Sequence, residues 1–544
     1  MGETAATGYP HDWPPVLVGR FLLQHAATRG DRAAVIANGR SHTYHELAQA
    51  GDQYQQAMLR AGLRGGDPVA VQMDFGFEAL AVLLACSEAG LLYVPFNSDL
   101  PEARMLEICR RVSPRLLVTG PGAAVPSPAL TGTVPLLALA HPVRLDISGS
   151  KPVRPRRGRP VLESDPTYVI FTSGSTGAPK GVVMSHRATT VAFRGIAAAS
   201  DAHDRLASVS PIGFDFSLLD AAAALGRGKT LICVPRGVRA HPRLLLEYLL
   251  EHQVQQLHCV PALWALLLRH CGDRVGELGR HLKRTVVGGD EVPVALVNAI
   301  RAALPGIEVL HLYGQTESIC CSFFPVPDPL PDHWQSLPLG DAYPGAELLL
   351  VDAQGEPIEA QGDVGELHLR SAALFDGYWH ADDLTARAMA PDPRTPDSHA
   401  RLYRTGDLAV RGPDGLFFVG RRDHQVQIYG NRVELEEVER CLAHAPGIAE
   451  VGVTDVRIGD KHLLVAVVSA HQGPAPTTAA LQEHCGKRLP RYMVPAKFLS
   501  IETLPMIAAG KLDRDALAKF AATTLAQESA DTEQPATVKG VVTP

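Results

Sequence analysis

The regular alternation of strand-like and helix-like segments is the feature that most constrains this fold. From about residue 21 to 419, short strand-like runs alternate with segments whose apolar residues recur at helical spacing. In one such segment the apolar positions are Val294, Val297, Ile300 and Leu304. Alternation of this kind predicts α/β layers with largely parallel sheet. The expected strands include 206–210, 230–234, 256–260, 285–289 and 309–314, and the expected helices include 218–225, 242–252, 261–270 and 294–304.

The length of the chain predicts more than one domain, because 544 residues exceed what one ordinary core organises. A second compact unit follows, with a helix at 434–443, a strand at 463–468 and a helix at 478–489. We therefore expect a large N-terminal α/β domain of mixed and parallel sheets with flanking helices over 1–422, and a small α+β domain over 423–523. The polar remainder, 524–544, contains no aromatic residue and is expected to be a disordered tail.

Composition narrows the class of protein. Hydrophobic residues make up 46% of the chain and charged residues 20%, which is typical of a globular protein. With 51 Lys and Arg against 58 Asp and Glu, the net charge of -7 argues against nucleic acid as the main partner. No apolar run approaches the ~18 residues of a membrane-spanning helix. The nine cysteines are scattered, which favours reduced thiols and a cytoplasmic location.

The segment 168–181, YVIFTSGSTGAPKG, combines a β-prone run with a loop rich in Gly, Ser and Thr. Its glycines permit close backbone approach, and its hydroxyls and one lysine offer donors and a positive charge, so the loop suits a polyphosphate. These residues are Gly174, Gly177, Gly181, Ser173, Ser175, Thr176 and Lys180. Because Lys180 is followed by Gly rather than Ser or Thr, this is not the phosphate loop of the kinase-like NTPases.

Other motifs follow in a fixed order along nearly the whole chain. They are SHTYHEL (41–47), AGLLYVPFNSDLPEAR (89–104), FDFS (214–217), YGQTE (313–317), GEL (365–367), YRTGD (403–407), GRRDHQVQIYGNRVELEEVE (420–439) and GKLDR (510–514). Together with 168–181, this ordered set resembles the adenylate-forming enzymes, and specifically the adenylation domains of nonribosomal peptide synthetases. The resemblance implies a ligase that uses ATP and Mg²⁺ to join a carboxylate to the α-phosphate, releasing pyrophosphate, with a small mobile C-terminal domain.

The resemblance also implies a nucleotide site. The β- and γ-phosphates would be held by Lys180 and its loop, and Gly288, Gly289 and Asp290 would form the loop beside the adenine. Tyr313 would lie along the adenine ring, and Asp407 would accept both ribose hydroxyls with Arg421 nearby. The phosphate-holding loop residues are Thr172, Ser173, Gly174, Ser175, Thr176 and Gly177.

Three further residues would act on the reacting groups. Glu317 resembles the magnesium ligand, because a carboxylate suits a hard cation. Thr316 would donate to the α-phosphate, and Lys511 would bridge the substrate carboxylate and the phosphate in the transition state. Each residue alone has an ordinary reading, such as a turn at Gly406-Asp407 or a solvated Lys511. The ordered set favours the functional one.

The hinge and the thiol-facing residues are also suggested by the resemblance. Asp423 corresponds to the family's hinge between the two domains. Gln427 stands where the family usually has a lysine, and Tyr429 where it usually has a basic residue, so the holding of the thiol substrate stays open. Gln315 replaces the proline common in peptide synthetases and is frequent in other branches of the superfamily.

Asp215, in FDFS, is the strongest indication of the substrate. In amino-acid-activating relatives an aspartate here pairs with the substrate ammonium, whose burial without a partner is costly. The alternative is that Asp215 caps the helix that begins near Ser217. The rest of the lining implied by the motifs is apolar, except for His258, and favours a small to medium apolar amino acid, with the α or β position of the amino group open. These residues are Phe216, Leu219, His258, Val286, Gly288, Leu312, Cys320 and Cys321.

The expected partner is a discrete carrier protein with a phosphopantetheine thiol, because only about 30 residues follow Asp515, too few for a fused domain. Loading of a β-amino acid as a polyketide starter unit is one option. The second reading is an acyl- or aryl-coenzyme A synthetase, which Gln315 favours and Asp215 disfavours. The third is a catalytically silent binding protein, against which the intact set of Lys180, Glu317, Asp407 and Lys511 argues.

Overall fold

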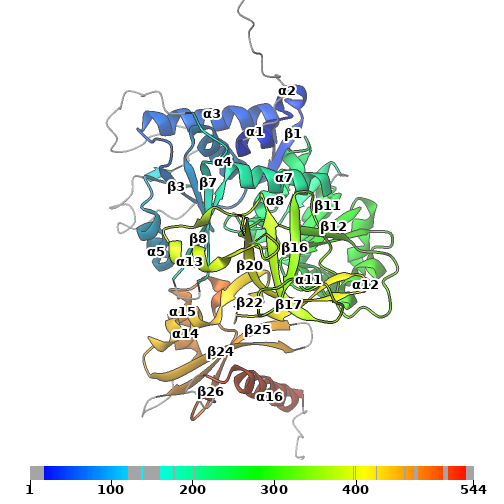
Figure 1. Ribbon diagram of the computed structural model, residues 1–544. Coiled ribbons are helices and arrows are strands. Elements are labelled where there is room, and N and C mark those ends of the chain that lie inside the picture. The colour runs from blue at the N-terminus through cyan, green and yellow to red at the C-terminus, as the bar shows by residue number, and fades with distance from the viewer. Residues whose placement is uncertain are drawn as a thin grey trace, which may run out of the picture. The chain divides into compact units, whose positions relative to one another are not determined.

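The computed structural model describes residues 17–120, 136–138, 160–174, 178–199, 203–395, 397–398, 400–423, 425–458, 461–470, 476–506 and 512–533. The chain divides into two compact units, which are described separately (Figure 1). The larger comprises Met1–Ser98, Cys109–Phe171 and Lys180–Arg422. The smaller comprises Asp99–Ile108, Thr172–Pro179 and Asp423–Pro544.

A nine-stranded sheet organises the larger unit, in the order β15-β14-β13-β12-β11-β9-β10-β1-β2. The strands from β13 to β1 in this order pair in parallel, while β14, β15 and β2 add antiparallel edges. Its strands are β1 (Ala33–Ala37), β2 (Arg40–Thr43), β9 (Arg205–Ser208), β10 (Thr230–Cys233), β11 (Gln256–Cys259), β12 (Arg284–Gly288), β13 (Glu308–Tyr313), β14 (Ser322–Pro325) and β15 (Asp341–Ala342). The expected parallel strands in the middle of the chain are thus confirmed within a few residues.

Two further sheets complete this unit. A seven-stranded sheet has the order β18-β8-β7-β4-β3-β5-β6, and a five-stranded sheet has the order β16-β17-β20-β19 with β21 on β20. The strands of the first are β3 (Pro68–Gln72), β4 (Leu92–Phe96), β5 (Leu116–Thr119), β6 (Leu136–Ala138), β7 (Pro166–Thr172), β8 (Lys180–Ser185) and β18 (Gly377–Tyr378). Those of the second are β16 (Ala346–Val351), β17 (Val364–Ser371), β19 (Met389–Pro391), β20 (Arg401–Gly412) and β21 (Gly415–Arg421).

Helices flank these sheets, as the alternation predicts for an α/β fold. They are α1 (Val18–Leu23), α2 (Ala26–Arg29), α3 (Tyr44–Arg60), α4 (Phe77–Ala89), α7 (His186–Ala199), α8 (Phe216–Leu225), α9 (Arg236–Arg239), α10 (Pro242–Glu251), α11 (Pro261–Cys271), the 3-10 helix η1 (Gly272–Arg280), α12 (Val294–Ala303) and α13 (Asp382–Ala388), while α5 (Glu102–Val112) spans both units. Local sequence explains their ends. At α3, for example, the Thr43 hydroxyl accepts from the Glu46 backbone at 3.1 Å and the Glu46 carboxylate accepts from the Thr43 backbone at 2.8 Å, a capping box.

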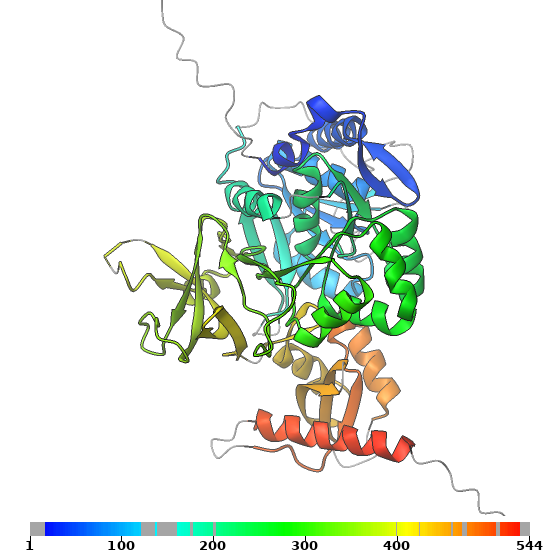
Figure 2. The same cartoon turned by 90° about the vertical axis from the view of Figure 1, so that its right-hand side faces the viewer.

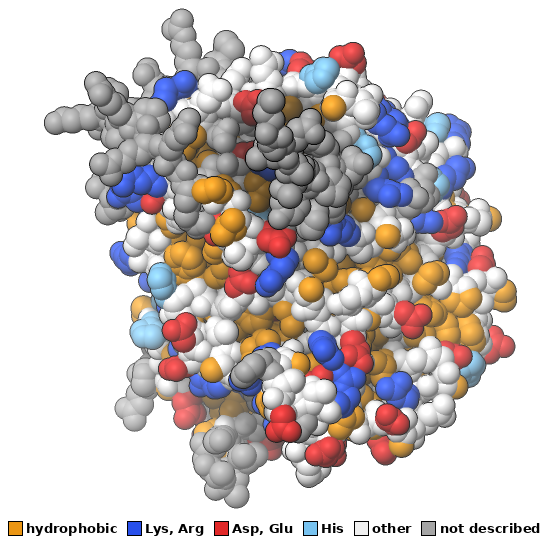
Figure 3. Space-filling view, turned by 45° about the horizontal axis from the view of Figure 1, so that its top comes forward, with side chains coloured by type: hydrophobic (Ala, Val, Ile, Leu, Met, Phe, Trp, Pro, Cys, Tyr) orange, Lys and Arg blue, Asp and Glu red, His pale blue; other side chains and the backbone are white. Residues whose placement is uncertain are grey.

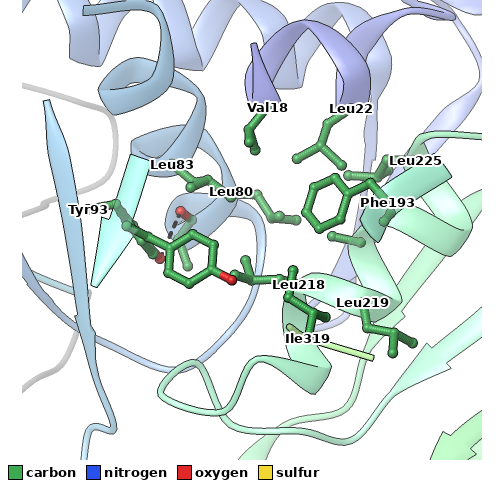
Figure 4. Close-up of a cluster of buried hydrophobic side chains, with 14 of the residues drawn as sticks. Val18, Leu22, Leu80, Leu83, Tyr93, Phe193, Leu218, Leu219, Leu225 and Ile319 are labelled. Atoms are coloured by element: carbon green, nitrogen blue, oxygen red, sulfur yellow. Dashed lines mark hydrogen bonds between the residues drawn. The ribbon is translucent and has the colours of Figure 1, made fainter. Parts of the chain in front are cut away.

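The main core of the larger unit joins the nine-stranded and seven-stranded sheets through α1, α4, α7 and α8. Figure 4 shows side chains from these helices meeting in it, including Leu22, Leu80, Phe193 and Leu218, with Ile319 beside them. α8 is buried along its whole length and is apolar apart from Ser217 and Asp220, which suits a helix between two sheets. A second core packs α10, α11 and α12 against the other face of the nine-stranded sheet.

The smaller unit is built on a three-stranded sheet, in the order β24-β25-β26, and a two-stranded hairpin. Its elements are β22 (Gln425–Ile428), β23 (Asn431–Glu434), α14 (Leu435–Ala443), β24 (Ile448–Ile458), β25 (Lys461–Ala470), α15 (Thr478–Gly486), η2 (Arg491–Met493), β26 (Lys497–Ser500) and α16 (Arg514–Glu533). One core packs α14 and α15 against the three-stranded sheet (Figure 2). A second core packs α16 against the alternate residues of the same strands, such as Val465 and Val467 of β25. This is the expected α+β arrangement.

The tail prediction is wrong in part. Residues expected to be disordered from 524 onward instead continue α16 as far as Glu533, and the remainder, 534–544, lies outside the described residues. The physical reason is that Leu517, Ala521 and Leu525 recur every four residues and are buried together.

The structure shows three properties that bear on the composition: the surface charge, the state of the cysteines and the polarity of the helices. Basic and acidic side chains are interspersed on the face shown in Figure 3. All nine cysteines are free thiols. Among the described residues, no helix is both long enough and apolar enough to span a bilayer.

Candidate active site

A buried cation–carboxylate pair lies where β8 begins. The Nζ atom of Lys180 is 3.6 Å from Oε1 of Glu317, which is fully buried. The hydroxyl of Tyr378 donates to the same oxygen at 2.7 Å, and Lys180 lies 5.0 Å from the centroid of the Tyr378 ring. Pairing of β18 with β8 brings Tyr378 to this place. Lys180 and Glu317, 137 positions apart in the chain, are therefore neighbours, as a shared role on one phosphate group requires.

Tyr378 is a member of this group that the sequence did not indicate. It is 61 positions from Glu317, and its motif, Gly-Tyr-Trp, carries no spacing related to the other residues. Its hydroxyl orients the Glu317 carboxylate, and its ring lies beside Lys180 at a distance that allows a cation–π contact.

Glu317 is a fitting ligand for Mg²⁺. It supplies one buried carboxylate, and the described residues hold no cluster of three or more His, Cys, Asp or Glu that could cage an ion. Mg²⁺ is commonly held by one or two carboxylates together with water and substrate phosphates, so a lone carboxylate beside Lys180 suits it. When bound, the ion would neutralise phosphate charge. The side chains of this chain hold and orient the reacting groups.

A second group of polar residues lies at β20 and β21. The Tyr313 hydroxyl donates to Oδ2 of Asp407 at 2.5 Å, and the guanidinium of Arg421 pairs with Oδ1 of the same carboxylate. Register explains the pair, because Asp407 lies opposite Arg421 between the two strands. Arg421 also donates to the Thr405 carbonyl at 3.2 Å, and the Asp407 backbone donates to the Thr405 hydroxyl at 3.0 Å. Asp407 is thus held in place by Tyr313, Arg421 and Thr405, and Thr405 belongs to the YRTGD motif, although no role was assigned to it.

The structure joins Tyr313 and Asp407 by a direct hydrogen bond, whereas the sequence assigned each of them a separate role. Burial and the Asp407 carboxylate raise the pKa of the Tyr313 phenol well above its usual value, so it stays a neutral donor. A ribose-binding role for Asp407, and an adenine-facing role for Tyr313, remain predictions.

The turn after β12 has a strict need for glycine. A Cβ atom on Gly288 would lie 2.3 Å from the Leu312 carbonyl oxygen, because Gly288 is paired with Leu312 in the neighbouring β13. Gly289 follows with a φ of +78°, which L side chains rarely adopt. Asp290 completes the turn, and its carboxylate accepts from the Glu291 backbone at 2.8 Å. The close packing of β12 on β13 is enough to require glycine at position 288, so this residue does not by itself indicate a ligand site.

Asp215 begins α8 and does not cap it. It is 4% exposed, its side chain makes no capping hydrogen bond, and its Oδ2 atom has no hydrogen-bond partner among the described residues. Burial, followed by the charge of Glu317, raises the pKa of this carboxyl to about 7, while hydrogen bonding by the Phe216 backbone and then by the Thr316 side chain lowers it. A buried carboxylate oxygen without a partner is costly, and capping of α8 does not account for the Oδ2 atom of Asp215.

The apolar residues expected around the substrate form one cluster in the structure. All six are buried and belong to the main core: Phe216, Leu219, Val286, Leu312, Cys320 and Cys321. The ring of Phe216 stacks on that of Phe214, with centroids 5.6 Å apart. Their role in lining a substrate pocket remains a prediction.

His258 is held by residues that the sequence did not indicate. Its Nδ1 lies 2.8 Å from Oδ1 of Asp220, whose Oδ2 accepts from the Ser208 hydroxyl at 2.5 Å. Its Nε2 lies 2.7 Å from the side-chain nitrogen of Gln256. Both ring nitrogens of His258 are engaged, and all four residues are buried. A place for His258 in the wall of a substrate pocket remains a prediction. Asp220 lies five positions after Asp215 on α8, and only the fold brings it to β11.

The described part of the phosphate loop belongs to the smaller unit. Thr172 ends β7, the Ser173 hydroxyl donates to the Arg432 carbonyl at 2.8 Å, and the Gly174 backbone donates to the Glu437 carboxylate at 3.3 Å. A backbone N–H suited to an anion is therefore bound by a carboxylate in this structure. Ser175, Thr176 and Gly177 lie outside the described residues, as does Lys511.

The remaining predicted positions lie where the second unit begins. The boundary between the units falls between Arg422 and Asp423, whose carboxylate accepts from the Gln425 backbone at 3.3 Å. Gln427 lies on β22. Tyr429 is at the hairpin turn with a φ of +51° and is 47% exposed. The hinge and thiol-facing roles remain predictions.

Comparison with known proteins agrees with this arrangement. Residues 22–379 match the AMP-binding enzyme family, and residues 437–511 match the AMP-binding enzyme C-terminal domain. The chain belongs to the AMP-binding enzyme family. It is an adenylate-forming ligase, and the resemblance seen in its motifs is confirmed.

Individual relatives of this ligase are similar over most of its length. It is 33% identical over 504 residues to novobiocin biosynthesis protein H of Streptomyces niveus, covering 90% of this chain and 80% of that one. It is 30% identical over 512 residues to an L-proline--[L-prolyl-carrier protein] ligase of Pseudomonas fluorescens, covering 91% and 98%. The crystal structure of IdnL1 matches with a TM-score of 0.81 and 36% identity, covering 91% and 100%. Other relatives are much longer synthetases, of which this ligase spans 44% and 6%.

Proposed function

We propose that this ligase activates an amino acid as aminoacyl-AMP and transfers the aminoacyl group to the phosphopantetheine thiol of a separate carrier protein. The observation that carries the proposal is the buried Asp215 carboxylate with its unpartnered Oδ2. An ammonium group supplies the charge and the N–H donors that such a carboxylate lacks. The apolar cluster around it suits a small to medium apolar side chain.

The chemistry has two steps. The substrate carboxylate attacks the α-phosphorus of ATP, a new oxygen–phosphorus bond forms, and the bond to the departing pyrophosphate breaks. The thiol then attacks the acyl carbon, a thioester forms, AMP leaves and the thiol proton is lost to solvent. In the first step Lys180 and Thr316 would meet phosphate charge and Glu317 would hold Mg²⁺. Asp407 would orient the ribose, and Lys511 would bridge the carboxylate and the α-phosphate.

Support for the carrier protein comes from a relative whose name includes an amino acid and a carrier protein, and which matches over 98% of its length. Starter-unit loading of a β-amino acid is part of this proposal. A β-amino group lies one carbon further from the carboxylate that Lys511 holds. Asp215 would then meet the ammonium at a different depth.

Pyrophosphate exchange over a matched set of acids tests the proposal. L-Leucine, β-leucine (3-amino-4-methylpentanoate) and 4-methylpentanoate share one carbon skeleton and differ only in the amino group. L-Alanine, β-alanine and propanoate form a smaller set. We expect at least one amino acid to be activated efficiently and its deamino counterpart poorly. Equal activation of 4-methylpentanoate or propanoate would instead favour an acyl-coenzyme A synthetase.

A further inference from the structure

Asn97 links the segment that carries Asp215 to the seven-stranded sheet. It directly follows β4, which ends at Phe96, and belongs to the motif 89–104, which the proposed steps leave without a role. Its side-chain oxygen, Oδ1, accepts a hydrogen bond from the Gly213 backbone N–H at 2.9 Å, across 116 positions of sequence. A side chain at the end of the seven-stranded sheet therefore holds the backbone two residues before Asp215.

The contact between Asn97 and Gly213 leaves no room for a larger residue at position 213. A Cβ atom on Gly213 would lie 2.9 Å from Oδ1 and 3.4 Å from Cγ of Asn97. A Cβ contact as short as the first is essentially never found in proteins, so the Asn97 amide lies directly against the Gly213 backbone. The two residues are thus matched in shape as well as in hydrogen bonding.

The segment 211–215 is a tight connection between β9 and α8. The Phe214 backbone donates to the Pro211 carbonyl at 3.0 Å, which closes a turn that contains Gly213. α8 starts from the carbonyl of Asp215, which accepts two backbone hydrogen bonds of the first turn at 2.9 and 3.0 Å. The direction in which the Asp215 side chain leaves the backbone is therefore set by this turn and by the helix that follows it.

The same turn also contacts the nine-stranded sheet. A Cβ atom on Gly289, in the turn after β12, would lie 3.5 Å from Cζ of Phe214, an ordinary van der Waals distance. The segment 211–215 is thus held at Gly213 by Asn97 and packs at Phe214 against the turn predicted to lie beside the adenine. A change in its backbone would therefore move the Asp215 carboxylate relative to the predicted nucleotide site.

We propose that Asn97 is a positioning residue for Asp215. Its hydrogen bond to Gly213 fixes the turn before the substrate arrives, so that no ordering of this backbone has to accompany binding of the substrate ammonium. Asn97 acts through the backbone and needs no contact with the substrate. This inference rests on the proposed activation of an amino acid and adds the residue that prepares its binding group.

Two substitutions remove the acceptor oxygen of Asn97, and a third keeps it. Asn97→Ala truncates the side chain, Asn97→Leu keeps its branched shape without the oxygen, and Asn97→Asp retains Oδ1. Pyrophosphate exchange gives KM for the amino acid that wild type activates best. We expect this KM to rise about fivefold in Asn97→Ala and Asn97→Leu, as loss of one neutral hydrogen bond predicts, and to stay near wild type in Asn97→Asp. KM for ATP should be unchanged in the first two variants.

A double-mutant cycle with Asp215→Asn separates positioning of Asp215 from a general effect on the fold. In the Asp215→Asn background we expect Asn97→Ala to leave KM for the amino acid almost unchanged, because the carboxylate that it positions is gone. In the wild-type background, Asn97→Ala should lower kcat/KM for the amino acid more than kcat/KM for its deamino counterpart. A purely structural role would lower both equally.

Ser98→Ala is the matched control. The Ser98 hydroxyl donates to Oδ1 of Asp74 at 2.5 Å, so this variant removes a side-chain hydrogen bond from the residue next to Asn97 without affecting the turn at Gly213. We expect KM for the amino acid to be the same as in wild type.

Four results would overturn the inference. They are an unchanged KM in both Asn97→Ala and Asn97→Leu, a rise that persists in the Asp215→Asn background, an equal rise in Ser98→Ala, and loss of folding in both Asn97→Ala and Asn97→Leu, which would make the hydrogen bond a purely structural one. Failure of the proposed function looks different, since wild type would then activate none of the amino acids or would not prefer them to the deamino acids.

Discussion

At the scale of single residues, the charge of Asp215 connects substrate binding to pH. Its raised pKa, about 7, means that the carboxyl is half protonated near neutral pH in the free protein. The groups around it, Glu317, Thr316 and Tyr168, supply no cation. An ammonium requires the ionised form, so we expect kcat/KM for the amino acid to fall about tenfold for each pH unit below 7. A pH profile of kcat/KM checks this, and a flat profile between pH 5.5 and 7 would contradict it.

The same carboxyl should lower stability at high pH. Its folded pKa is raised above the ordinary value of 3.8, so the folded state binds this proton more tightly than the unfolded state. The contribution of this carboxyl to stability is therefore greatest below about pH 4, is lost as the pH rises from about 4 to about 7, and stays low above 7. Asp215→Asn has no charge to bury. We expect it to raise the free energy of unfolding at pH 8 by roughly 1–4 kcal/mol, measured by denaturant titration, with no gain at pH 4.

Lys511 is the residue whose contribution should be confined to the transition state. We expect Lys511→Ala to reduce pyrophosphate exchange by at least about a hundredfold while ATP binding stays within a few-fold. Single-turnover formation of acyl-AMP and equilibrium binding of ATP measure the two quantities separately. Exchange within a few-fold of wild type would remove Lys511 from the mechanism.

At the scale of elements, the segment at Asp423 joins the two units. If a change of domain orientation separates the two half-reactions, the backbone rotation concentrates at a few residues there. Proline fixes φ, so Asp423→Pro should slow thioester formation more than adenylation. Pyrophosphate exchange and thioester formation are measured independently, and Asp423→Ala, which keeps φ free, is the control. An equal loss in both half-reactions would argue against a hinge.

The helices and strands also show which parts of the fold could be predicted from the sequence. Strands β9 to β13 and helices α8, α10, α11 and α12 were predictable because each is a short apolar run or a helical repeat of one dominant period. α16 was not, because its polar composition hid the four-residue recurrence of Leu517, Ala521 and Leu525 that packs it on the sheet.

In the candidate active site, too, residues within sequence motifs could be predicted, whereas residues that contact them only through the fold could not. Lys180, Glu317, Asp407 and Asp215 lie in contiguous motifs, so the sequence indicated them. Tyr378 acts across a strand pairing and Asp220 between a helix and a strand, with no spacing that a single sequence preserves. The contacts that hold the charged residues in place were therefore visible only in three dimensions.

At the scale of the whole molecule, the remaining question is which thiol receives the acyl group. We expect efficient turnover with a phosphopantetheine-bearing carrier protein and turnover with free coenzyme A at least about a hundredfold lower in kcat/KM, a difference of about 2.7 kcal/mol. Thioester formation with both acceptors at equal aminoacyl-AMP levels decides this. Efficient use of coenzyme A and none of any carrier protein would favour the coenzyme A synthetase.

The most direct test of the central claim, that Asp215 holds the amino group of the substrate, is pyrophosphate exchange by Asp215→Asn. The measured quantity is KM for the amino acid that wild type activates best, with KM for ATP as the internal control. The account predicts at least a roughly tenfold rise in KM for the amino acid, an unchanged KM for ATP, and no such rise for the deamino acid. An unchanged KM, or a wild type that activates the deamino acid as well as the amino acid, would contradict it.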